Sequence, residues 1–258
     1  MINKKKIKNI IILIVILLIY IWAFSGLKIG GIKSSAGQVV SSIIHGLFHP
    51  DWAYINPPDG EGLISTMIET IAIAILGTFV SAVLCIPIAF IAANNIVSFK
   101  AVPFITKFLL SFIRTFPELV MAILFIKAVG PGAFAGVLAL GVHSVGMLGK
   151  LYAEAIENMD MGPSEALVAC GANKFQVLWF AVIPQILPEF ASLTLYRFDI
   201  NVRSASILGL IGAGGIGTPL IFALNARGWS RVGIILLGII ITVIIIEFLS
   251  SAIRKRLV

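Results

Sequence analysis

The six residues from Gly212 to Gly217 match the G-x-G-x-x-G spacing of loops that bind dinucleotides. That chemistry needs a strand before the glycines, a helix after them and an acidic side chain about 20 residues further on. Here a long apolar run precedes the glycines, Thr218-Pro219 follows them, and the next acidic residue is Glu247. The surroundings argue against a nucleotide site and favour a helix end with close packing or a gate, with an anion-binding nest of backbone amides as the alternative. The glycines concerned are Gly212, Gly214, Gly215 and Gly217.

Nucleophilic side chains offer a second kind of chemistry. His143-Ser144, with Ser204 or Ser206, could supply parts of an intramembrane enzyme. No activating third group or nucleophile motif accompanies them, and the chain has no G-x-x-x-x-G-K-[ST] phosphate loop. We therefore expect no catalytic residues and no ATP hydrolysis by this chain.

Metal ligation is the third possibility. His45 and His49 have i,i+4 spacing, but only Asp51 stands near them as a third ligand. Cys85 and Cys170 are too far apart to indicate a disulfide framework or a metal site. We expect the two cysteines to be packing residues and the chain to hold no metal or other cofactor.

The elements that carry these residues are strongly apolar. Of the 258 residues 59% are hydrophobic and only 12% are charged, with a mean hydropathy of +1.06. A helix needs about 20 apolar residues to cross a bilayer. The sequence therefore predicts one all-α integral membrane domain over residues 1–258, with a core at 65–252 and an uncleaved first span. The six expected spans are 8–27, 65–93, 104–128, 132–152, 187–211 and 232–252.

Basic residues set the expected orientation. With the N-terminus inside the cell, those at 4–8, 100–107, 150, 174 and 254–256 fall on the cytoplasmic side. Both termini are then cytoplasmic, the glycine-rich stretch lies at the outer end of span five, and an outer segment occupies about 28–62. The net charge of +7 reflects this topology and contact with lipid, so we expect no nucleic-acid partner. The few outer basic residues are Lys28, Lys33, Lys127, Arg227 and Arg231.

The cytoplasmic segment at about 153–186 should fold as a helix, a turn and a helix. Gly162-Pro163 breaks the chain, Ser164 or Asp160 can cap a new helix, and Glu165 suits its N-terminal end. Gly171 can end that helix in the left-handed conformation. Apolar residues on this segment indicate a protein contact, and an amphipathic helix lying on lipid is the alternative.

This segment resembles the EAA loop of ABC importer permeases, whose short helix docks into the cytoplasmic ATPase. Leu167 stands where that motif usually has a second alanine, and Ala181 replaces a usual isoleucine. Both changes keep a small or apolar surface. The residues assigned to this coupling loop are Glu165, Ala166, Leu167, Gly171, Ile183 and Pro184.

A longer resemblance covers nearly all of the chain from residue 49 onward. It is similar to the phosphonate-type permeases of that superfamily at 49–58, 69–78, 113–122, 143–160, 162–167, 181–190 and 195–217. The resemblance implies type I importer architecture and a permease subunit, in a bacterial cell membrane, for phosphonates or related phosphorus oxyanions. It also implies a cytoplasmic ATPase dimer that binds ATP and magnesium, an extracytoplasmic substrate-binding protein, and a second permease copy or a paralogue. The alternatives are an importer of phosphite, phosphate or methionine, or a channel or secondary carrier.

Charged residues inside the expected spans have two possible roles. The structural one is mutual pairing, of Glu189 with Arg197 or of Asp199 with Arg203 at i,i+4. The functional one is that surplus positive charge lines the path of an anion, since guanidinium groups suit phosphorus oxyanions. The candidate pathway residues are Arg114, His143, Arg197, Asp199 and Arg203.

Overall fold

The computed structural model describes residues 4–26, 36–57, 62–97 and 99–257, and all regular structure within these ranges is helical. The chain divides into two units, Met1–Ile44 and His45–Val258, which are described separately. Part of the outer segment expected at 28–62, including Lys28 and Lys33, lies outside the described residues.

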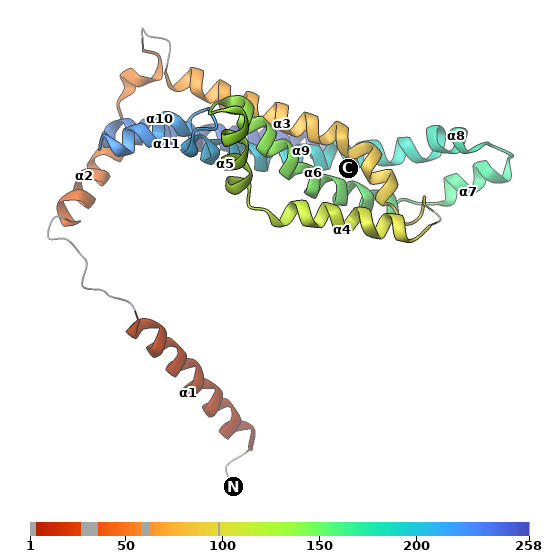
Figure 1. The fold of residues 1–258 in the computed structure, drawn as a ribbon, viewed down its shortest axis with the longest axis horizontal. Helices are drawn as coiled ribbons and strands as arrows, with labels where there is room; N and C mark the ends of the chain where they lie inside the picture. Colours follow the sequence, from red (N-terminus) through yellow and green to blue (C-terminus); the bar gives the residue numbers. More distant parts are fainter. Residues whose placement is uncertain (1–3, 27–35, 58–61, 98, 258) are drawn as a thin grey trace. The chain divides into compact units, whose positions relative to one another are not determined.

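The first unit carries α1 (Lys4–Ser25), the expected first span (Figure 1). Its stretch Lys8–Ser25 is long and apolar enough to cross a membrane. Every described side chain from residue 8 to 26 is exposed, so α1 packs against no described part of its own unit. Such a helix depends on lipid or on another protein to cover its apolar surface. The next helix, α2 (Ala36–Phe48), crosses the boundary between the two units.

The second unit is a bundle of long helices (Figure 1). Its core is α6, which packs against α3, α4, α5 and α9, while α11 packs against α9. Five helices of the described chain are long and apolar enough to cross a membrane, and a bent pair makes up to six. The bundle helices are α3 (Leu63–Ala92), α4 (Ala101–Thr115), α5 (Glu118–Val129), α6 (Ala133–Glu157), α9 (Ile183–Leu208) and α11 (Trp229–Leu257).

Shorter elements join the long helices. A 3₁₀ turn, Trp52–Ile55, leads to α3, and α7 (Gly162–Ala169) and α8 (Lys174–Val177) join α6 to α9. A π-helical turn, Leu178–Val182, makes α8 and α9 continuous. At the other end of α9, a 3₁₀ turn at Gly209–Ile211 is followed by α10 (Gly217–Asn225), a helix that the six-span prediction did not include.

The third expected span, 104–128, is not one straight helix. It is divided into α4 and α5, which meet at 83°. Phe116 has an extended backbone (φ −75°, ψ 126°) because it precedes Pro117, and a residue before proline avoids the helical region. At 1.5 Å per residue the 15 residues of α4 and the 12 of α5 reach only about 22 and 18 Å, less than the hydrocarbon core. A span in this region therefore needs both helices together.

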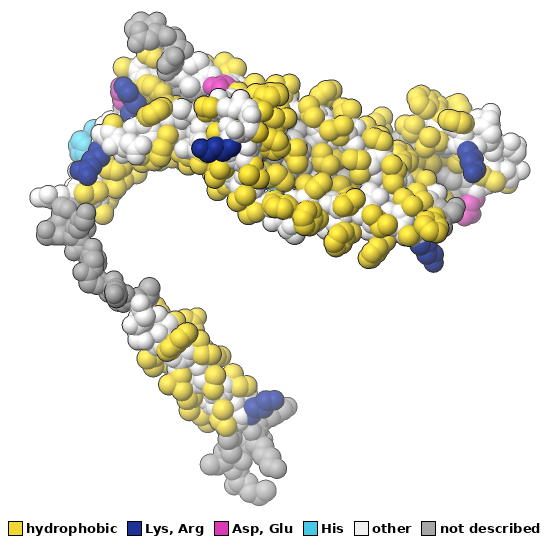
Figure 2. All heavy atoms as spheres, in the orientation of Figure 1, with side chains coloured by type: hydrophobic (Ala, Val, Ile, Leu, Met, Phe, Trp, Pro, Cys, Tyr) yellow, Lys and Arg dark blue, Asp and Glu magenta, His cyan; other side chains and the backbone are white. Residues whose placement is uncertain are grey.

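The surface of the second unit suits a lipid environment. Hydrophobic side chains cover the long helices on the visible face, and most charged side chains seen there lie near the two ends of the bundle (Figure 2). Large apolar residues such as Phe104, Phe108 and Phe79 are 71%, 62% and 64% exposed. In water such a continuous apolar surface would be unstable, so the fold agrees with a multi-pass membrane protein.

Candidate functional site

Arg197 is buried in the bundle, with 2% of its surface exposed. Its guanidinium donates hydrogen bonds to Oε1 of Glu118 at 2.8 Å and to Oγ of Ser144 at 2.9 Å. The same nitrogen that meets Glu118 lies 2.9 Å from Nδ1 of His143, and that Nδ1 lies 3.0 Å from Glu118 Oε1. The remaining nitrogen lies 3.3 Å from the sulfur of Met147. The charge of Arg197 is therefore paired inside the protein, and so is His143.

The network continues to α3. Asn201 donates to Oγ1 of Thr78 at 2.8 Å and to Oγ of Ser144 at 3.0 Å. We call the set Thr78, Glu118, His143, Ser144, Arg197 and Asn201 the buried polar network. It joins α3, α5, α6 and α9, and through Glu118, the first residue of α5, it holds the helix that follows the bend.

Arg197 does not pair with Glu189, as one expectation had it; its carboxylate partner is Glu118. Sequence spacing could not identify Glu118 as the partner, since the two residues are 79 apart. The other expected pair is present, with Arg203 Nη2 at 2.7 Å from Asp199 Oδ2. Asp199 is buried, whereas the Arg203 side chain is 47% exposed.

Arg114 differs from both of these arginines. It lies exposed in the last turn of α4, two residues before the bend at Phe116. Among the described residues it forms no ion pair. The five candidate pathway residues thus separate into the buried Arg197 with the partly buried His143, the pair of buried Asp199 and half-exposed Arg203, and Arg114, which has no ion-pair partner among the described residues. Whether any of them contacts a substrate stays a prediction.

The expected helix–turn–helix element is present at the other end of α6. Asp160 Oδ1 accepts a hydrogen bond from the Gly162 amide at 2.9 Å, and Pro163 lies in the first turn of α7. Of the two expected caps, Asp160 bonds the first amide of α7, whereas the buried Ser164 hydroxyl has no hydrogen-bond partner in the described part of the chain. Gly171 has φ +83°, and its amide donates to the carbonyl of Val168 at 2.9 Å. These are the local signals predicted for the start and end of the helix.

This element presents apolar side chains outward. We call Val168, Phe175, Trp179 and Phe180 the α7–α8 patch; they are 61%, 82%, 65% and 69% exposed. Glu165 and Ala166 are also exposed, on α7 itself. An exposed patch of large apolar residues rimmed by polar ones marks a protein contact or a membrane contact.

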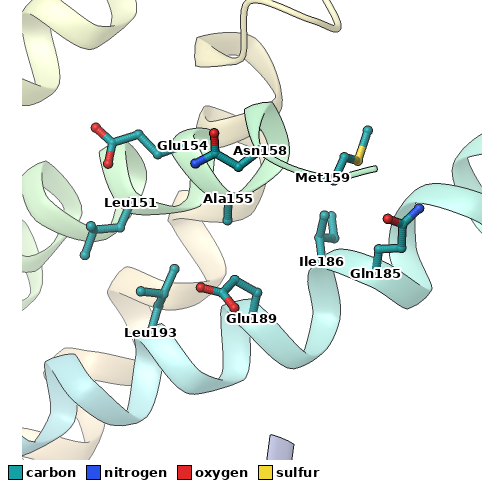
Figure 3. Close-up of a pocket in the computed structure, with 9 residues that line it drawn as sticks. All are labelled: Leu151, Glu154, Ala155, Asn158, Met159, Gln185, Ile186, Glu189 and Leu193. Carbon is teal, nitrogen blue, oxygen red and sulfur yellow. The ribbon is translucent and has the colours of Figure 1, made fainter. Parts of the chain in front are cut away.

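A cavity of about 440 Å³ lies between the last turns of α6 and the first turns of α9 (Figure 3). Glu154 and Asn158 line it from α6, and Gln185 and Glu189 from α9, with Glu189 pointing toward α6. Gln185 also donates to the Asp160 carbonyl at 3.2 Å, which links this wall to the start of α7. Its lining includes two carboxylates and no basic residue, so the cavity is unsuited to an anionic ligand.

The glycine-rich stretch forms a turn packed among the helices. Gly212, Gly214 and Gly215 have φ of +92°, +82° and +75°. The Ile216 amide donates to Thr70 Oγ1 in α3 at 2.8 Å. A Cβ on Gly217 would lie 2.4 Å from the Ser206 carbonyl oxygen, so only glycine fits there. The helix end and close packing predicted for this stretch are thus found, and a helix, not a strand, precedes it.

The histidine pair does not extend to a ligand cluster. The His45 and His49 rings stack with centroids 4.2 Å apart, and His49 Nδ1 lies 3.0 Å from the His45 carbonyl oxygen. Within the described ranges, no group of three or more His, Cys, Asp or Glu side chains could hold a metal ion. Cys85 is buried in α3 and Cys170 is exposed after α7.

Three comparisons relate this geometry to known proteins. The family model of the binding-protein-dependent transport system inner membrane component matches residues 85–258. A phosphite transport system permease protein of Stutzerimonas stutzeri is 44% identical over 78% of this chain and 74% of its own length. A phosphate-import permease protein of Mycolicibacterium smegmatis is 42% identical over 79% of this chain but 38% of its own length.

Solved structures share the fold at lower identity. The inward-facing MetNI methionine ABC transporter matches with a TM-score of 0.67 and 19% identity, over 76% of this chain and 96% of its own. At that identity the match concerns the fold alone. The family match covers most of the bundle, including α7, the glycine turn and every member of the buried polar network except Thr78. The chain belongs to the binding-protein-dependent transport system inner membrane components, the permease subunits of ABC importers, whose ATPase activity resides in a separate partner.

Proposed function

We propose that this chain forms the membrane pathway of an ATP-driven importer for phosphorus oxyanions, a class that includes phosphite, phosphate and phosphonates. The observation that carries the proposal is the identity of 44% and 42% to permeases named for phosphite and phosphate, over more than three quarters of this chain. The similarity to the methionine transporter is far lower, at 19%.

In this proposal α7 couples the chain to the ATPase. Glu165, Ala166 and Leu167 lie on the short helix α7, Gly171 follows its end in the left-handed conformation, and Ile183 and Pro184 begin the helix that carries its motion into the bundle. The α7–α8 patch supplies apolar surface of the kind that a protein partner buries. The ATPase dimer, which binds ATP and magnesium, lies on this side, so this side is cytoplasmic.

The orientation follows from the same assignment. With α7 inside the cell, the termini are both cytoplasmic and the glycine turn lies toward the outer side. The extracytoplasmic binding protein delivers its ligand there. Irregular backbone at membrane depth is tolerated only where protein buries it or where it lines a cavity, so we place the glycine turn beside the pathway as a packing or gating element.

Arg114 is our candidate for the cation that meets the substrate. It is exposed and unpaired among the described residues, next to the bend at Phe116, whereas Arg197 and His143 are held by Glu118. A guanidinium offers several donors in one plane to phosphorus oxygens. Two permease copies, or this chain with a paralogue, enclose the pathway, and ATP-driven closure of the ATPase dimer moves α7 and opens the pathway outward.

Uptake by the reconstituted importer tests the function. Vesicles would contain this chain, its cognate ATPase and its binding protein, with labelled phosphite, phosphate, methylphosphonate or methionine outside. We expect ATP-dependent uptake of at least one phosphorus oxyanion and none of methionine. Uptake of methionine alone, or oxyanion uptake that continues without the ATPase, would contradict the proposal.

Variants separate the two assigned regions. Gly171→Arg should weaken ATPase binding and abolish uptake while the chain still inserts, because the left-handed position disfavours a side chain. Arg114→Gln should raise KM for the transported oxyanion about tenfold, as expected when a charged hydrogen bond is lost. Lys127→Gln, which removes an exposed cation from the last turn of α5, is the matched control.

A further inference from the structure

Helix α9 turns one row of side chains outward. The row contains Tyr196, Ile200, Arg203 and Ile207, spaced by four, three and four residues. Tyr196 is 39% exposed and Ile207 is 52% exposed, and the Arg203 side chain between them is 47% exposed. A basic residue therefore lies in the middle of an otherwise apolar outer face.

Helix α11 has a similar interruption. Ile244 and Phe248 are 60% and 74% exposed, and Glu247 is exposed beside them. Glu247 forms no ion pair within the described part of the chain. A carboxylate is thus placed on an apolar outer face of the neighbouring helix.

The two charges lie at the same level of the bundle. The Arg254 guanidinium of α11 lies 5.7 Å from the ring centroid of Tyr196, and Ile246 is buried in one cluster with Val202 and Ala205 of α9. The helices therefore run antiparallel. Seven residues lead from Tyr196 to Arg203 and seven lead back from Arg254 to Glu247, a rise of about 10 Å on each helix.

Within the described ranges the two charges are at most partly paired. Arg203 bonds one oxygen of Asp199 and its side chain is still 47% exposed, and the exposed Glu247 forms no ion pair with a described residue. Ionised side chains that face lipid are costly, and in membrane proteins they face protein or water instead. We call Arg203 and Glu247, with the apolar residues Ile207 and Phe248 beside them, the charged face.

We propose that the charged face is the contact between two copies of this chain, with Arg203 of each copy paired to Glu247 of the other. Copies inserted in the same direction are related by a two-fold axis along the membrane normal, so a residue meets only residues at its own depth. Arg203 and Glu247 have opposite charge and equal depth, and the symmetry makes the pair reciprocal. The inference rests on the proposed function, in which two permease copies enclose the pathway.

Charge exchange between copies tests the pairing directly. Copies carrying R203E and copies carrying E247R would be given different tags and purified with the ATPase, alone and co-expressed. Each variant by itself places like charges at both contacts, so its self-association should fall at least about tenfold. The mixed pair restores both contacts, and its association and uptake should return to within about twofold of the wild-type values.

An ion pair within one chain gives the opposite result. It would be broken in each variant and would not be restored by mixing, so failure of the mixed pair overturns the proposal. Arg114→Glu mixed with E247R is the control, since Arg114 lies on α4, and it should give no recovery.

Cysteine pairs remove the complication that R203E lies near Asp199. In a C170S background, a copy with R203C and a differently tagged copy with E247C should form an interchain disulfide under mild oxidation. The control is a copy with R203C mixed with a copy carrying Ile123→Cys, on the exposed face of α5, and this mixture should form no disulfide. Absence of the first product overturns the proposal. If wild-type copies neither associate nor transport, the proposed function fails as well; if they do both and the mixed pairs fail, only this inference falls.

Discussion

Truncation of Glu118 to alanine is expected to destabilise the bundle more than any exposed charge substitution. It leaves the Arg197 guanidinium, 2% exposed, without its carboxylate partner. Removal of one member of a buried ion pair costs about 3–5 kcal/mol, and at about 1.4 kcal/mol per factor of ten the folded-to-unfolded ratio falls at least about 100-fold. Glu118→Gln keeps an acceptor for Arg197 and should cost less.

Unfolding of the purified chain in mild detergent measures this loss. The double variant Glu118→Ala, Arg197→Met removes the stranded charge and should be more stable than Glu118→Ala alone. Lys150→Ala is the control, because the ion pair between Lys150 and Glu154 is long, at 4.0 Å, and lies at the surface. Such pairs contribute about 0–1 kcal/mol to stability. A Glu118→Ala chain as stable as the Lys150→Ala chain would refute this account of the network.

Three further outcomes follow from local geometry. Gly217→Ala should lower the free energy of unfolding by about 1–3 kcal/mol, because its Cβ would lie 2.4 Å from a backbone oxygen. Gly37→Ala, whose Cβ would meet nothing within 4 Å, should leave that free energy unchanged. Thermal unfolding of the two variants in detergent measures the difference. Gly171→Val should lose about 1–2 kcal/mol at its φ of +83° and lower ATPase co-purification, and unchanged co-purification would contradict the coupling assignment. Lys107→Ala removes hydrogen bonds of 2.7 and 2.8 Å to the two oxygens of Glu157 and should lower the stability of this region by about 1–3 kcal/mol. Backbone amides at the end of α6 should then exchange their hydrogens faster.

Local signals in the sequence predicted the helix–turn–helix geometry after α6 and the end of α9 at the glycine turn. Gly162-Pro163 and Gly171 act within a few residues of their own positions, so the start and end of α7 could be inferred without the rest of the fold. The same holds for Asp199 and Arg203, which are one helical turn apart. Hydropathy likewise located the spans, because crossing a bilayer constrains length and composition more than packing does.

Contacts between distant segments could not be inferred in this way. Glu118 and Arg197 are 79 residues apart, and Asn201 and Thr78 are 123 apart, so no periodicity brings them together. The bend at Phe116 had a signal in Pro117, but the apolar run around it was continuous enough to suggest one straight span. Helix α10 was missed because Thr218-Pro219 suggests a break, while Pro219 in fact lies in the first turn of a short helix.

The link between Glu118 and Arg197 also sets an order of assembly during synthesis. Glu118 leaves the ribosome 79 residues before its cation exists, a delay of about 4–16 s at roughly 5–20 residues per second. Until then the carboxylate has only His143 as a basic partner in the network, and α5 has no fixed place against α9. The bent pair can already pack on α6, which is made before α9, and the arrival of α9 then supplies the cation that completes the ion pair with Glu118.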